Sequence, residues 1–180
     1  MMYKKINIYR LSLSAMLLAL VFVLPLLTGQ VPQLGERFCP MHIPVFLCGY
    51  LCSAYWGLAV GFVGPLLRSL IVGVPAPLFP KGIAIAFELA AYGFMSGFLY
   101  KLLPKKRSNL YLSLIISMVA GRLVRAFVQL CCVGFDLTKF SFSAFGTVVV
   151  LNALPGIVIQ LLLIPVLVSA VEKYKSRERR

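Results

Sequence analysis

The feature that most constrains this chain is a succession of apolar runs, each close to the length that crosses a lipid bilayer. About 20 predominantly apolar residues form a helix long enough to span the hydrocarbon core. With 61% hydrophobic and only 13% charged residues, the 180-residue chain lacks the polar surface that a soluble fold needs. The sequence therefore predicts an all-α integral membrane protein with one transmembrane domain over residues 1–180.

Prolines, glycines and basic connections divide the apolar sequence into six runs. The segment from Gly73 to Pro80 ends the third run, because its prolines lack the amide hydrogen that a continuing helix needs. The second and third runs are nearly continuous, with Gly57 and Gly61 close to the tight turn expected between them. The predicted bundle of six transmembrane helices covers about residues 9–27, 42–55, 56–72, 81–103, 110–133 and 143–171.

Basic residues gather at the ends of these runs, and 12 of the 18 lie in three clusters. The clusters precede the first run, follow the fourth run and close the chain. This is the distribution that the positive-inside rule produces, so we predict that both termini and the 101–109 connection are cytoplasmic. The net charge of +13 is then a signal of topology and not of nucleic-acid binding. The clusters are Lys4, Lys5 and Arg10; Lys101, Lys105, Lys106 and Arg107; and Lys173, Lys175, Arg177, Arg179 and Arg180. The N-terminal run has no small-x-small cleavage site after it, so we interpret it as a retained span.

Four ionisable side chains lie inside the apolar runs: Arg68, Glu88, Arg122 and Arg125. A charge at bilayer depth costs at least ~2.5 kcal/mol, so such residues normally face a protein interior or a watery cavity. From the helical rise, Arg68 lies ~8 Å and Glu88 ~10 Å from the outer ends of their spans. Arg125 lies ~13 Å and Arg122 ~18 Å from the outer end of the fifth span. Three positive charges and one negative charge therefore predict a net positive pocket in the outer half of the membrane.

Neutral polar residues reach the same level of the membrane. His42 begins the second run, and Asn152 lies ~13 Å from the outer end of the sixth. Arg122, Arg125 and Gln129 have the spacing i, i+3, i+7, which places them on one face of a helix. We expect these side chains to line the pocket with the charged ones.

Structural roles are the alternative for each of these residues. Glu88, with Tyr92 one turn later, can neutralise one arginine and pin two helices together, which is compatible with a ligand site. The arginines can cap backbone carbonyls, His42 can bond at the membrane interface, and Tyr92 can pack. Asn152 can repair backbone hydrogen bonds loosened by Pro155. One carboxylate still cannot neutralise three guanidiniums, so the excess charge favours an anionic ligand, whose carboxylate or phosphate arginine grips bidentately.

Motifs of catalysis and of nucleotide or metal binding are missing from the sequence. There is no G-x-x-x-x-G-K-[ST] loop, no H-E-x-x-H and no plausible Ser/His/Asp set. The odd count of five cysteines, four of them in apolar runs, resembles neither a disulfide framework nor a zinc site. The sequence thus predicts a protein that is not an enzyme and that uses neither a cofactor nor a metal.

Several segments resemble the substrate-binding S component of energy-coupling factor (ECF) vitamin transporters. The stripe Ala15-x-x-x-Ala19 on the first run is one, and the stretches Pro40–Val45, Gly64–Arg68 and Ala86–Gly93 are others. The resemblance covers nearly all of the chain and includes the six spans and the long first outer connection.

The resemblance implies a multi-subunit transporter, which the residues alone do not indicate. S components of bacterial plasma membranes bind a micronutrient in an outward-facing pocket and dock on a membrane-embedded T subunit driven by two ATPase subunits. The small-residue stripe faces the T subunit in this family, which assigns Ala15 and Ala19 to partner contact. The S component is thought to tilt in the membrane and release its cargo inside.

Applied to this chain, the resemblance predicts a vitamin-binding transporter subunit. Arg122 and Arg125 would anchor an anionic group, and Arg68 would assist them or pair with Glu88. Pantothenate or a folate suits such a pocket, whereas cationic thiamine suits it poorly. The other side chains expected to contact the substrate are His42, Tyr92, Gln129 and Asn152.

Two functions of other classes remain open from the sequence. The first is a self-sufficient secondary carrier in which Glu88 takes up a proton, although neither inverted repeats nor paired broken helices are visible. The second is a membrane scaffold subunit that takes no part in transport and binds no small molecule.

Overall fold

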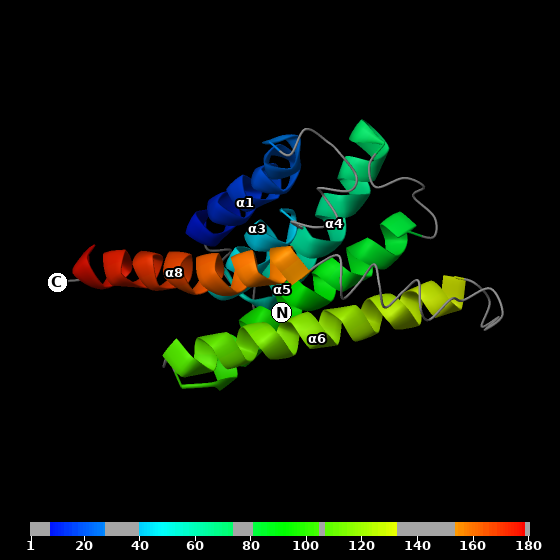
Figure 1. Cartoon of the computed structure of the whole chain (residues 1–180). Coiled ribbons are helices and arrows are strands. Elements are labelled where there is room, and N and C mark those ends of the chain that lie inside the picture. The colour runs from blue at the N-terminus through cyan, green and yellow to red at the C-terminus, as the bar shows by residue number, and fades with distance from the viewer. Residues whose placement is uncertain (1–7, 28–39, 74–80, 105–106, 133–153, 179–180) are drawn as a thin grey trace, which may run out of the picture.

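The computed structural model describes residues 8–27, 40–73, 81–104, 107–132 and 154–178, and every regular element within them is a helix (Figure 1). Five of these helices are long and apolar enough to cross a membrane. The all-α, multi-pass prediction is confirmed at this level. The helices are α1 (Ile8–Leu27), α3 (His42–Leu51), α4 (Ala54–Val72), α5 (Ile83–Leu102), α6 (Arg107–Cys132) and α8 (Leu154–Glu178).

The second predicted span, 42–55, differs most from the structure. Helix α3 ends at Leu51 after 10 residues. At the helical rise that is ~15 Å, about half of the ~30 Å hydrocarbon core. The chain turns at Cys52 and Ser53, where the Ser53 amide bonds the Cys48 carbonyl. The predicted turn near Gly57 and Gly61 is therefore wrong in position, because both glycines lie inside α4.

The ends of α4 and α5 agree with the sequence closely, whereas α8 continues to Glu178, seven residues past the predicted end of the sixth span at 171. Helix α4 ends at Gly73, whose φ of 72° is readily adopted only by glycine and which caps the helix through its amide on the Ser69 carbonyl. Helix α5 covers residues 83–102, within the predicted run 81–103. The predicted turn segment 74–80 and the outer connection 134–142 lie outside the described residues.

Glycines hold α4 and α5 together. Gly57 on α4 faces Gly93 on α5, and a Cβ on either one would collide with the backbone of the other. Gly61 meets the backbone of α5 at Leu89 in the same way, and Gly97 meets Ala54. The spacings Gly57-x-x-x-Gly61 and Gly93-x-x-x-Gly97 thus serve close packing, as interfaces of small residues do in membranes.

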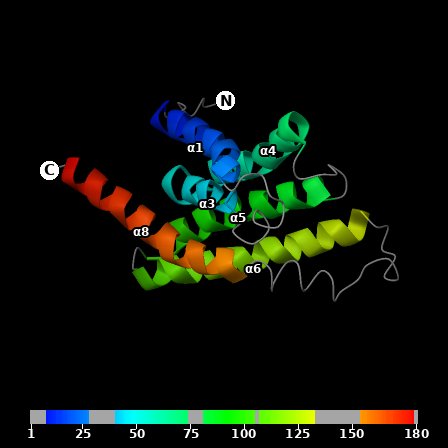
Figure 2. The same cartoon turned by 45° about the horizontal axis from the view of Figure 1, so that its top comes forward.

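Helix α5 is the central element of the bundle, since it packs against α3, α4 and α6 (Figures 1 and 2). Its buried side chains include Leu89 and Tyr92, which join Phe46 of α3 and Leu114 of α6 in the core. Cys48 and Cys52 lie in the same core with free thiols, as expected of small apolar packing residues. Any side chain placed on α5 can therefore meet partners from three other helices.

The helix ends that carry basic clusters lie on one side of the bundle. Figures 1 and 2 show the start of α1, the end of α5, the start of α6 and the end of α8 toward the left. We call this side the basic end. The ends of α4 and α6 and the start of α5 lie on the other side. This arrangement agrees with the sequence argument for topology, while the cytoplasmic placement of the basic end stays a prediction.

Polar side chains link four helices near the basic end. The Tyr50 hydroxyl of α3 lies 3.0 Å from the Ser113 hydroxyl of α6. The Tyr50 ring meets the Tyr100 ring of α5 edge-on at 5.2 Å, and the Tyr100 hydroxyl donates to Glu172 of α8. The acidic Glu172 is thereby engaged within the bundle.

Candidate functional site

Glu88 forms the centre of a polar cluster at the end of the bundle opposite the basic end. Its side chain is buried, with 2% of its surface exposed. Arg125 of α6 donates from Nη1 to Glu88 Oε2 at 3.0 Å, and the Tyr92 hydroxyl donates to Oε1 at 2.6 Å. Both carboxylate oxygens are therefore engaged, and the predicted pinning of two helices by Glu88 is confirmed for α5 and α6.

Tyr92 brings helix α3 into the same cluster. Its ring stacks on Phe46 with a centroid distance of 5.0 Å, and it lies 5.1 Å from the His42 ring. His42 and Phe46 are one helical turn apart on α3, so a single face of that helix supplies both contacts. The two rings hold the Tyr92 hydroxyl in position toward Glu88.

Sequence reasoning missed two residues that shape this cluster, Phe46 and Gly121. A Cβ on Gly121 would collide with the Tyr92 ring and would lie 3.0 Å from the Glu88 carbonyl oxygen. The absence of a side chain at Gly121 thus lets α6 approach α5 closely enough for Arg125 to reach Glu88. Two features of the sequence could have pointed to them. Gly121 directly precedes Arg122, and Phe46 lies one helical turn after His42.

Arg68 approaches from the last two turns of α4. Only 4% of this residue is exposed. Its Nη1 donates to the Met41 sulfur at 3.8 Å, next to His42. A thioether is a weak neutral acceptor, so this contact helps to position the guanidinium.

The remaining predicted site residues differ in how the structure places them. Arg122 and Gln129 are both half-buried on α6, on either side of Arg125, as expected for residues that share one face. Asn152 lies outside the described residues. The structure therefore brings Glu88, Arg125, Tyr92 and His42 into direct contact, with Arg68 at the neighbouring Met41.

Three arginines and one carboxylate lie on the helices that form this cluster. Arg125 pairs with Glu88, Arg68 contacts Met41 beside His42, and Arg122 is half-buried on α6 three residues before Arg125. Glu172 bonds Tyr100 near the basic end. A guanidinium can form charge-assisted, bidentate hydrogen bonds with a carboxylate or phosphate. These arginines are therefore suited to contacting a ligand with a negative group.

The groups that converge in this cluster are suited to recognising a ligand. Among the described side chains, no three His, Cys, Asp or Glu residues come close enough together to hold a metal ion. The polar groups that do converge are guanidiniums, a carboxylate, a phenol and an imidazole, all fixed by neighbours.

Comparison with known proteins identifies the family. Residues 9–168 match the model of a family described as the substrate-specific component of ECF transporters. Searches of curated proteins and of solved structures return no match. The matched region includes all of the cluster residues and nearly all of the five membrane-spanning helices. The chain therefore belongs to the family of ECF transporter substrate-specific components, which makes it a membrane-embedded transport subunit.

Proposed function

We propose that this S component binds an anionic, vitamin-like molecule at the Glu88 cluster and delivers it across the bacterial plasma membrane. In this proposal the whole chain, residues 1–180, forms one substrate-binding domain that works with a T subunit and two ATPase subunits. The observation that supports the anionic class is that the guanidinium of Arg125 lies at the buried Glu88 cluster, with a second buried arginine, Arg68, at the neighbouring Met41. An ionised carboxylate or phosphate on the ligand can accept bidentate, charge-assisted hydrogen bonds from arginine.

In this proposal the arginines have different roles. Arg125 bonds Glu88, so its charge is shared between that carboxylate and the ligand. Arg122 anchors the anionic group with Arg125, and Arg68 assists them. His42 and Tyr92 provide neutral polar contacts, and Gln129 and Asn152 extend the same site.

Removing the charge of Arg68 or of Arg122 tests this proposal. We expect Arg68→Gln and Arg122→Gln each to weaken binding of the anionic substrate by about 10- to 100-fold, since each removes a charge-assisted hydrogen bond of about 1.5–3 kcal/mol. Native mass spectrometry of the gently purified protein identifies a co-purified substrate. Titration calorimetry with that substrate, or with a panel of pantothenate, folate and thiamine, then measures affinity.

Arg10→Gln is the matched control, because Arg10 is exposed near the start of α1 at the basic end. It should leave affinity unchanged. Equal affinity of wild type, Arg68→Gln and Arg122→Gln, with all three folded, would contradict the anchoring role. Preference for cationic thiamine would contradict the anionic class. Substrate uptake by the purified chain in liposomes that contain no ATPase subunits would instead support the proton-coupled carrier.

Contact with the T subunit is proposed for the exposed face of α1. Ser14, Leu17 and Val21 are buried on the face of α1 that packs against α3 and α4. Ala15 and Ala19 are exposed, four residues apart on a different face. Small side chains there leave a flat strip on which another membrane helix can pack closely.

Bulky residues on that strip should impair assembly with the T subunit and leave substrate binding unchanged. We expect the double variant Ala15→Trp/Ala19→Trp to reduce co-purified T subunit at least about tenfold, a loss of at least ~1.4 kcal/mol in association free energy. Substrate affinity of the isolated chain should not change. Val119→Trp on the exposed side of α6 is the control and should assemble normally. Normal recovery of the T subunit with the double variant would exclude this strip as the contact.

A further inference from the structure

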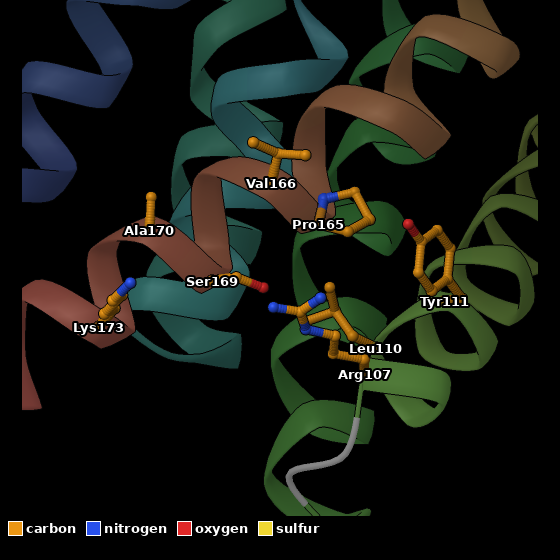
Figure 3. Close-up of a pocket in the computed structure, with 8 residues that line it drawn as sticks. All are labelled: Arg107, Leu110, Tyr111, Pro165, Val166, Ser169, Ala170 and Lys173. Atoms are coloured by element: carbon orange, nitrogen blue, oxygen red, sulfur yellow. The ribbon is translucent and has the colours of Figure 1, made fainter.

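A second polar site lies at the basic end of the bundle, far along α6 from Arg125. The start of α6 and the end of α8 enclose an open pocket of about 270 Å³. Its polar lining consists of Arg107, Tyr111, Ser169 and Lys173. Figure 3 shows the Arg107 guanidinium directed toward the Ser169 hydroxyl, with Lys173 one turn further along α8. This pocket shares no residue with the Glu88 cluster.

The electrostatics of the pocket favour an anion. Arg107 and Lys173 are both exposed, and no carboxylate is among the described residues that line the pocket. Glu172, the neighbour of Lys173, is bonded to the Tyr100 hydroxyl and belongs to the link with α5. Arg107 is also the first residue of α6, where the helix dipole adds positive potential.

The rest of the pocket is apolar, which limits the kind of anion. Leu110 and Pro165 are buried and form its floor, and Val166 is exposed beside them. Val166 precedes Lys173 by seven residues, so the wall extends ~10 Å from the charged mouth into the depth of the membrane. A small inorganic anion would use only the mouth. An amphiphile with a charged head and an apolar tail would use the whole pocket.

We propose that this pocket binds the headgroup of an anionic phospholipid. Arg107 and Lys173 hold its phosphate, and the Ser169 and Tyr111 hydroxyls donate to phosphate or glycerol oxygens. The first acyl carbons lie along Leu110 and Val166. Basic pockets between membrane helices near the interface recognise anionic lipids by this combination. Such a lipid would bridge the start of α6 and the end of α8 and hold them together. The proposal is independent of the identity of the transported substrate.

Lipid titration followed by native mass spectrometry tests the proposal on the full chain. Delipidated protein is titrated with phosphatidylglycerol or with phosphatidylcholine of the same acyl chains, and the occupancy of the first bound lipid is measured. We expect phosphatidylglycerol to be preferred. Arg107→Gln and Lys173→Gln should each weaken its binding about fivefold and the double variant about 30-fold, while phosphatidylcholine binding stays unchanged. Ala170→Trp, which fills the pocket and keeps both charges, should also displace the lipid.

Lys101→Gln is the matched control, because Lys101 is exposed in the last turn of α5 at the same end but does not line the pocket. It should bind phosphatidylglycerol like the wild type. An equal loss with Lys101→Gln would show general attraction to a basic surface and overturn the proposal, as would equal binding of phosphatidylcholine. Inorganic phosphate is the third probe. If it stabilises the protein against heat as strongly as phosphatidylglycerol and this needs Arg107 and Lys173, the pocket is a free-anion site and the lipid assignment is wrong.

Discussion

Replacing Arg125 by methionine is expected to lower the free energy of unfolding by about 3–5 kcal/mol, because it leaves the Glu88 carboxylate buried without its cation. The carboxylate is 3% exposed and bonds Arg125 at 3.0 Å. Water cannot replace the lost guanidinium at such a position. Thermal or denaturant unfolding in detergent, followed by circular dichroism, measures the effect.

A double-mutant cycle shows whether the effect comes from the pair. Glu88→Gln removes the charge but keeps an oxygen to accept the Tyr92 hydroxyl. Alone it should also destabilise, since Arg125 then lacks the carboxylate. Combined with Arg125→Met it should recover most of the loss, because breaking a buried pair costs more than removing both partners. Arg10→Met, at an exposed position, should stay within about 0.5 kcal/mol of wild type. Additive losses in the double variant would mean that Glu88 and Arg125 do not stabilise each other.

The existence of this cluster follows from sequence, but the pairing within it does not. Counting residues at the helical rise gives the height of each side chain in the membrane, and it places Arg68, Glu88 and Arg125 in one half, with Arg122 near the midplane. Height says nothing of which helices are neighbours. The choice of Arg125 as the partner of Glu88 depends on the contact of α5 with α6, which the missing side chain of Gly121 permits.

The boundaries of the helices also differ in whether they depend on local sequence or on tertiary contacts. Gly73 ends α4 where its sequence predicts, because capping is decided by the residue itself. The turn between α3 and α4 was predicted too far along the chain, because glycine is common both in turns and in close helix contacts. Gly57 and Gly61 form close helix contacts here. Neither a proline nor a charged residue stands between Val45 and Gly64, so these residue types did not mark the turn.

A basic residue at a helix end can indicate membrane topology or can line a binding pocket, and the sequence does not distinguish these two roles. Arg107 and Lys173 belong to clusters that indicate membrane topology, and 66 residues separate them in the chain. Only the antiparallel packing of α6 and α8 places them around one pocket. The face of α1 that carries Ala15 and Ala19 is likewise known to be exposed only after the buried face is seen to meet α3 and α4.

Substituting Gly57 by valine is expected to destabilise the protein by more than about 3 kcal/mol. A Cβ at this position would lie 2.8 Å from the Gly93 carbonyl carbon. That atom belongs to the α5 backbone and cannot rotate away, so α4 and α5 must separate. Glu88 and Tyr92 both lie on α5, so a shift of that helix changes their contacts with Arg125 of α6 and His42 of α3. We therefore expect loss of substrate binding together with loss of a monodisperse peak in size-exclusion chromatography.

Ala59→Val on the same helix is the control that isolates packing from helix propensity. Ala59 is exposed two residues further along α4, and valine there adds methyl groups toward the surroundings instead of toward α5. This variant should keep the wild-type unfolding temperature and substrate affinity. If Gly57→Val behaved like Ala59→Val in both measurements, α4 and α5 could not be in backbone contact at this point. The contacts of Glu88 with Arg125 and of Tyr92 with His42 would then need another support, because in this structure the α4–α5 contact helps to place the helix that carries Glu88 and Tyr92.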